Sequence, residues 1–359
     1  MPVSAERVHA AVAELCDLPG PTGQEDAVRE HLRAAWEPYA SELRTDAVGN
    51  LLARVGEGSG PRLLIEAHMD EIGFKVRAIT DDGFLLLANA QTNQLEPQER
   101  RYMVGQPAQV VRRGEVVAQG IFAAPSGHVL TPKLMAEGHL LVSDFFLDIG
   151  CASRAEAQAR GVHVGASVIF DVAARSLGTR VVGKAMDDRM LLAIMTLLLE
   201  RLDPAALTVD LWLGATVQEE NGLHGARALA ATERFDAVIA LDVGLTGDVP
   251  ILAVGDVATT MGAGPIVVHS DQMIHYHGPL TWELLEVARA AGIPVQDGMF
   301  GGYGSDGCAF FDAGMRAALV ATPVRYTHTA VEMVDVGDVA QTVELLNAYV
   351  TGPARAARG

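Results

Sequence analysis

The chain has 359 residues, three cysteines and a formal net charge of −18, and no apolar run approaches the roughly 18 residues needed to span a bilayer. This length predicts two domains, because single cores stop growing near about 250–300 residues, and the acidity argues against nucleic-acid and membrane partners. The cysteines are too widely spaced for a disulfide framework or a cysteine zinc site, and the first 17 residues lack a signal-peptide pattern, so we expect a cytoplasmic protein.

The N-terminal part of the chain predicts two helices followed by two strands. Apolar residues at helical spacing in the first 40 residues indicate two amphipathic helices separated by a Pro-Gly-Pro turn. Thr22 lies three residues before Glu25 at the start of the second helix, a spacing that predicts a capping box. Two short apolar runs, Leu51–Val55 and Leu63–Ala67, predict strands with glycine-rich turns between them.

The middle of the chain differs from both ends. From residue 73 to residue 174, short β-type stretches such as Pro107–Arg112 and Glu115–Ala118 alternate with glycine and proline, which predicts an inserted β-rich domain. Residues 1–72 and 175–359 would then form one discontinuous domain, whose second segment has the alternating pattern of an α/β fold. Its expected helices are Asp188–Leu202, Leu223–Ala231, Pro279–Ala291 and Val339–Val350, and its expected strands are Val209–Ala215, Ala237–Leu241 and Ala317–Ala321.

Two pairs of polar residues stand beside apolar elements of this domain. His68 and Asp70 are two apart at the end of a predicted strand and therefore point to the same side, as suits a metal-binding histidine and the carboxylate that orients it. A plain polar strand end explains them equally well. Asp187 and Asp188 precede a long apolar helix, where the local pattern favours an N-cap, although Asp188 could cap while Asp187 faces a site.

Three further positions add carboxylates and a histidine. Glu219 and Glu220 follow the strand Val209–Ala215. In such a pair, one carboxylate can bind a metal ion while the other accepts a proton from metal-bound water. Asp242 follows the run Ala237–Leu241, and His328 lies in a later loop, where a lone histidine is usually exposed polar surface. Taken together, the two histidines and the carboxylates favour paired sites for Zn²⁺, Co²⁺ or Mn²⁺.

Five strings occur in the order AHMDEIGF, GKAMDDR, TVQEENGLHGA, ALDVG and RYTHTAVEMV. Together they resemble the family 42 metallopeptidases, which are the tetrahedral, glutamyl and deblocking aminopeptidases and include relatives labelled cellulase M. The similarity spans nearly the whole chain. The chain departs from the family pattern at Asn221, His224, Thr329 and the string Gly304-Ser305-Asp306-Gly307. The departures that follow Glu220 lie beside the expected site and leave the preferred substrate side chain open.

The resemblance implies an α/β catalytic domain with a mixed sheet sandwiched by helices, and an inserted small β-barrel-like dimerisation domain. It also implies two divalent metal ions, with Asp187 bridging them, His68 and Asp242 completing one site, and Glu220 and His328 completing the other. Asp70 would orient His68, and Glu219 would be the general base. Dimers of this family are implied to assemble into a tetrahedral dodecamer.

The expected reaction is hydrolysis of the first peptide bond of short peptides by a two-metal aminopeptidase. An amide hydrolase or deacylase acting on N-acyl amino acids would use the same metal centre and differ only in its pocket. A glycosidase would need two carboxylates about 5–10 Å apart and no metal. A non-catalytic scaffold would have no need of all five ligands and the base.

A glycine-rich segment, Gly298–Asp306, joins the strand-like run Ile293–Gln296 to the apolar run Ala309–Phe311 and is predicted to close over a pocket, with an ordinary flexible connection as the alternative. It carries Met299, Phe300 and Tyr303 but no lysine or arginine. Burying a substrate carboxylate without a cationic partner is costly, so uncharged substrate side chains are expected to be preferred over acidic ones. Arg325 or His224, supplied from elsewhere, could reverse this preference.

Overall fold

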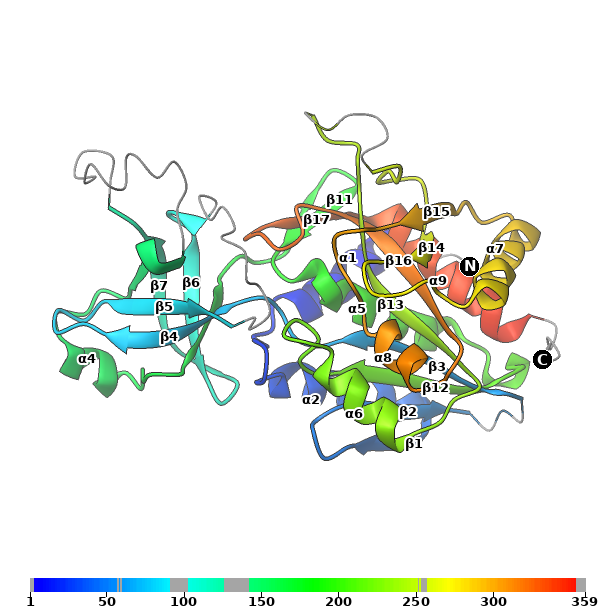
Figure 1. Cartoon of the computed structure of the whole chain (residues 1–359), viewed down its shortest axis with the longest axis horizontal. Coiled ribbons are helices and arrows are strands. Elements are labelled where there is room, and N and C mark those ends of the chain that lie inside the picture. Colours follow the sequence, from blue (N-terminus) through cyan, green and yellow to red (C-terminus); the bar gives the residue numbers. More distant parts are fainter. Residues whose placement is uncertain are drawn as a thin grey trace.

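The computed structural model describes residues 3–56, 58, 60–90, 103–125, 142–250, 252 and 257–352. Within these ranges a mixed sheet of 11 strands forms the larger part of the molecule (Figure 1), in the order β1-β2-β12-β3-β13-β16-β17-β11-β10, with β14 paired to β16 and β15 to β14. Its strands are β1 Ala40–Thr45, β2 Leu51–Val55, β3 Arg62–His68, β10 Arg175–Leu177, β11 Arg180–Gly183, β12 Asp210–Thr216, β13 Ala237–Leu245, β14 Ile266–Ser270, β15 Gln296–Met299, β16 Ala317–Arg325 and β17 Glu332–Asp335.

Helices cover both faces of this sheet. Successive side chains of a strand point to opposite faces, and in β3 Leu63 and Ile65 join one apolar core while Leu64 joins another. The first core contains helices α1 Ala5–Cys16, α2 Asp26–Trp36, α5 Met186–Arg201, α7 Gly278–Ala291 and α9 Val336–Thr351. The second contains α6 His224–Thr232 and α8 Gly307–Asp312. Burial on both faces explains why the central strands read as continuous apolar runs.

The inserted segment contains a closed barrel with the strand order β4-β5-β8-β7-β6-β9, drawn apart from the large sheet in Figure 1. The strands are β4 Phe74–Ile79, β5 Leu85–Asn89, β6 Pro107–Arg112, β7 Glu115–Ala123, β8 Phe146–Asp148 and β9 Ser167–Phe170, with the short helix α4 Arg154–Ala159 beside them. Its core is built on the rings of Phe74, Phe122 and Phe170, which contact one another. The predicted α/β class, with a mixed sheet between helices and a small barrel, is confirmed.

Several local predictions were wrong in detail. β13 and β16 continue past the predicted ends at Leu241 and Ala321, because their parallel pairing runs on to Leu245 and Val324. The apolar run Ala309–Phe311, for which no element was predicted, lies in helix α8. The strand expected near Ile293–Gln296 begins only at Gln296, and β1, β10, β11, β14 and β17 were not predicted. Among the described residues, no helix combines the length and the apolar character needed to cross a membrane.

The predicted capping box is also wrong. Glu25 precedes α2, but that helix has no side-chain cap at its start. The hydroxyl of Thr22 donates instead to Asp70 Oδ2 at 2.9 Å, and Glu25 Oε1 accepts from the backbone N–H groups of Gly23 and Gln218. Both side chains are buried, and apart from Gly23 these partners come from distant segments of the chain and not from the first turn of the helix.

Candidate metal centre

The carboxyl ends of the central parallel strands place the candidate side chains on one edge of the sheet. Thr216 of β12 pairs with His68 of β3, so the loop carrying the two glutamates begins beside that histidine. Ala240 of β13 pairs with Glu66, which sets Asp242 level with His68. This edge is where open α/β sheets bind their ligands, and the register alone brings residues from three strands to it.

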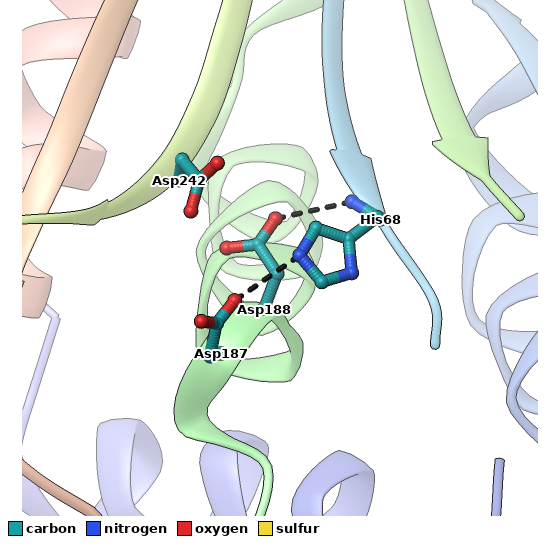
Figure 2. Close-up of side chains that lie close together, drawn as sticks. All are labelled: His68, Asp187, Asp188 and Asp242. Carbon is teal, nitrogen blue, oxygen red and sulfur yellow. Dashed lines mark hydrogen bonds and ion pairs between the residues drawn. The ribbon is translucent and has the colours of Figure 1, made fainter. Parts of the chain in front are cut away.

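One cluster joins His68, Asp187, Asp188 and Asp242, whose ligand atoms all lie within 4.8 Å of one another. In Figure 2 the imidazole of His68 faces the carboxylate of Asp187, and the two groups are 3.1 Å apart from Nε2 to Oδ1. The backbone N–H of His68 donates to Asp188 Oδ2 at 3.0 Å. All four side chains are buried.

A second cluster joins Asp187, Glu220 and His328 within the same 4.8 Å limit. His328 Nε2 lies 3.3 Å from Asp187 Oδ2 and 3.4 Å from Glu220 Oε2. Asp187 therefore belongs to both clusters and presents one oxygen to each histidine. Burial by itself would raise the pKa of Asp187, but the hydrogen bonds with His328 and His68 hold it well below its ordinary value.

The excess of buried carboxylates fits a pair of cations. Burial, together with the charge of Asp187, raises the pKa of Asp242 well above its usual range, and burial also raises that of Glu220. Asp188 Oδ1 and Glu220 Oε1 are buried, and neither has a hydrogen-bond partner among the described residues. Since buried charges are normally paired or coordinate metals, these nitrogen and oxygen donors suit divalent zinc-like ions.

Asp70 and Glu219 lie beside the clusters without belonging to either. Asp70 Oδ1 is 3.4 Å from His68 Nδ1, the ring nitrogen that points away from Asp187. Glu219 Oε2 is 4.0 Å from His68 Nε2, and burial raises the pKa of Glu219 well above its ordinary value. The structure thus brings all seven predicted site residues together.

The sequence pattern gave a wrong role to Asp187 and Asp188 and did not identify Glu332 as part of the site. The N-cap interpretation of Asp187 and Asp188 is wrong, because α5 begins without a side-chain cap and Asp188 turns to the backbone of His68. Glu332 accepts from the backbone N–H groups of Asp187 at 3.0 Å and His328 at 2.9 Å, and so ties two candidate ligands together. Burial and the charge of Asp187 raise the pKa of Glu332 to about 8. The only sequence signal for it was its place in the string RYTHTAVEMV.

A mixed α/β sheet that gathers two carboxylate–histidine clusters around one shared aspartate defines a metal-dependent hydrolase. The sequence profile of the M42 glutamyl aminopeptidases matches residues 49–345. The chain therefore belongs to this family of metallo-aminopeptidases, as its five strings predicted.

Relatives of known structure or activity agree with this assignment. The aminopeptidase APDkam598 of the archaeon Desulfurococcus kamchatkensis superposes with a TM-score of 0.91 at 29% identity, over 99% of this chain and 98% of that one. The TET1 peptidase of Pyrococcus horikoshii, described as assembling into a tetrahedron or a large octahedral shell, superposes with a TM-score of 0.84 at 27% identity, over 96% and 100% of the two chains. A lysyl aminopeptidase of Pyrococcus furiosus is 27% identical over 94% of this chain and 95% of its own length.

Proposed function

We propose that the protein is a two-metal aminopeptidase that releases N-terminal residues from short peptides in the cytoplasm. The observation that carries the proposal is the position of Asp187, shared by both clusters, with Glu219 close to His68 but outside either cluster. His68, Asp187 and Asp242 would hold one divalent ion, and Asp187, Glu220 and His328 a second. When bound, Zn²⁺ or Co²⁺ supplies Lewis acidity toward a carbonyl oxygen and toward water.

The protein's own contribution to the reaction rests on Glu219. Its carboxylate lies at the sheet edge beside His68, and burial raises its pKa, which makes it a stronger base than an exposed glutamate. It would take a proton from the attacking water and pass it to the leaving amine, a role typically worth about 10²–10⁴-fold. Asp70 would keep the imidazole of His68 in the orientation that presents Nε2 to the site.

An assay panel distinguishes this activity from that of a deacylase with the same ligands. The carboxylates at the site outnumber the histidines, and such surroundings favour a substrate that brings a positively charged free amine. We expect leucyl-p-nitroanilide to be cleaved and its N-acetyl derivative to be resistant. Cleavage of the blocked substrate at a comparable rate would favour the N-acyl amino acid hydrolase.

Removal of metal is expected to abolish this activity and to lower the melting temperature. A ligand present at about 1,000 times its Kd stabilises the folded state by about 4 kcal/mol, and two ions would contribute separately. Dialysis against a chelator, followed by calorimetry, should show the loss of stability, and Zn²⁺ or Co²⁺ should restore both stability and turnover. Full activity in the metal-free protein would contradict the two-metal mechanism.

The barrel segment, residues 73–174, is proposed to build a dimer that assembles further into a dodecamer. Among the described residues of this segment, four large apolar side chains are exposed, namely Val104, Val116, Ile121 and Val164, and an association surface would remove such side chains from water. The shell-forming TET1 peptidase has the same fold. Light scattering at micromolar concentration should give a multiple of the 38.0 kDa chain mass.

A pair of substitutions tests the surface that forms the dimer. Ile121→Lys, at a side chain that is 53% exposed, should shift the mass toward the monomer, because a lysine ammonium would be buried at the contact. Val48→Lys is the control, since Val48 is 49% exposed but lies outside the barrel. A monomeric wild-type protein would contradict the proposal.

Uncharged substrate side chains are proposed to be preferred. Family membership leaves the preferred side chain open, because the family is described as glutamyl aminopeptidases and one relative as a lysyl aminopeptidase. Tyr303 donates its hydroxyl to the backbone carbonyl of Val243, next to Asp242, which supports a position near the first cluster. The guanidinium of Arg325 is paired with Asp248, so its charge is already balanced.

We therefore expect kcat/KM for leucyl substrates to exceed that for glutamyl substrates by at least about tenfold, which corresponds to ~1.4 kcal/mol of discrimination. Tyr303→Ala should reduce this ratio, whereas Tyr39→Ala, at an exposed tyrosine in the turn after α2, should not. Faster glutamyl cleavage that is unaffected by Tyr303→Ala would contradict both the preference and the role of the segment.

A further inference from the structure

The loop that carries the two glutamates is held by its backbone in an unusual way. Four successive N–H groups, from residue 217 to residue 220, donate to buried side chains that come from three other parts of the chain. The bonds run from Val217 to Asn50 Oδ1 at 3.0 Å, from Gln218 to Glu25 Oε1 at 3.2 Å, from Glu219 to Asp70 Oδ1 at 2.9 Å and from Glu220 to Asp70 Oδ2 at 3.3 Å. Side chains from other parts of the chain therefore fix the path of this loop.

The backbone at this point needs such support. Gln218 has a φ of 56°, in the left-handed region that side chains with a Cβ rarely adopt. Strained conformations of this kind persist only when the surrounding structure over-determines them, and they gather at functional sites. The strained residue lies directly before Glu219, so its conformation sets where that carboxylate points.

The acceptors are themselves fixed. Asn50 is fully buried, and its amide donates to Asp46 Oδ2 at 2.7 Å and to the backbone carbonyl of Gly225 at 2.9 Å. A Cβ at Gly225 would lie 2.5 Å from Asn50 Oδ1, so glycine is required for this approach. Glu25 Oε1 also accepts from the N–H of Gly23 at 2.7 Å. Because these other hydrogen bonds hold both acceptors in place, a shift of the loop would break its bonds to them.

We propose that Glu25 and Asn50 are positioning residues for the general base, acting through the backbone of the 217–220 loop. The inference rests on the proposed function, because it assumes that Glu219 moves the proton. Neither residue belongs to either carboxylate–histidine cluster, and both act only as acceptors toward the loop. A misplacement of about 1 Å at a catalytic group can cost about 10²-fold in rate, which sets the scale of the effect.

Glu25→Ala is expected to lower kcat by about 10–100-fold with little change in KM, because ground-state binding does not involve this loop contact. Glu25→Gln should restore kcat to within about threefold of wild type, since its amide oxygen can accept the same N–H bonds. Burial and the nearby charge of Asp70 raise the pKa of Glu25 to about 7, so a neutral side chain is tolerated there. Asn50→Ala should resemble Glu25→Ala.

Two controls separate positioning from a general loss of stability. Asp26→Ala changes the next residue, whose side chain is exposed and paired with Arg29 on α2, and should leave kcat unchanged. Thr196→Ala removes a buried partner of Trp36 far along α5 and should lower the melting temperature without lowering kcat. A fall in kcat for Thr196→Ala as large as that for Glu25→Ala would overturn the proposal.

A double-mutant cycle with Glu219→Gln supplies the decisive measurement. If Glu25 acts through Glu219, the Glu25→Ala change should have little further effect on kcat once Glu219 is already glutamine. Titration calorimetry with Zn²⁺ should give affinities for Glu25→Ala within about threefold of wild type. Full additivity, a large loss of metal affinity, or failure of Glu25→Gln to restore kcat would each overturn the positioning role. The cycle also includes the single variant Glu219→Gln. Normal turnover by that variant would overturn the role of Glu219 in the proposed function, whereas the outcomes above concern only the role of Glu25.

Discussion

Glu219→Gln is expected to lower kcat by about 10²–10⁴-fold while two metal ions remain bound per chain. The amide keeps the shape of the side chain but cannot accept and return a proton. Glu219 is outside both clusters, with its carboxylate oxygen 4.0 Å from His68 Nε2, so its neutralisation should leave the ligand sets intact. KM should change little, because the lost interaction is made in the transition state.

The measurement combines steady-state kinetics with metal analysis of the purified variant. Glu233→Gln is a suitable control, since it makes the same chemical change on a side chain that pairs with Arg44 and Arg62, away from the clusters. If Glu219→Gln turned over substrate at nearly the wild-type rate, another group would have to serve as the base.

Asp187→Asn is expected to lose both metal ions together with the activity. Asp187 is the only residue common to the two clusters of described residues, and each of its oxygens faces a different histidine. An asparagine side chain is neutral and has one oxygen in place of two, so neither site keeps its ligand set. Substitution of groups that merely support a ligand costs about 10–100-fold in affinity, and the loss of a shared ligand should exceed that.

Comparison with Asp188→Asn makes this test specific. Asparagine at position 188 can still accept the N–H of His68, so its metal content should fall much less than that of Asp187→Asn. Circular dichroism of both variants checks that the fold is retained. Two metals per chain in Asp187→Asn would remove this residue from the shared position and would require a different pairing of the ligands.

Local sequence patterns determined much of the framework. The strand Leu51–Val55 was predicted with the bounds that β2 has, because a short run that is apolar except for Arg54 reports burial on both faces of a sheet. His68 and Glu219 could be singled out for a related reason, since ionisable residues at or just beyond the end of a buried strand stand at the edge where parallel sheets bind ligands. The five ordered strings then indicated the family.

Only the tertiary structure decided which partner each polar side chain has. The spacing of Thr22 and Glu25 fits a helix cap, yet both side chains turn to acceptors and donors at positions 70 and 218. Glu332 likewise binds the backbone of Asp187, 145 residues away along the chain. Periodicity in a sequence reports which face of an element is buried. A buried hydrogen bond depends on which distant segment the packing places beside it, because a buried polar group must be satisfied by whatever partner lies within reach.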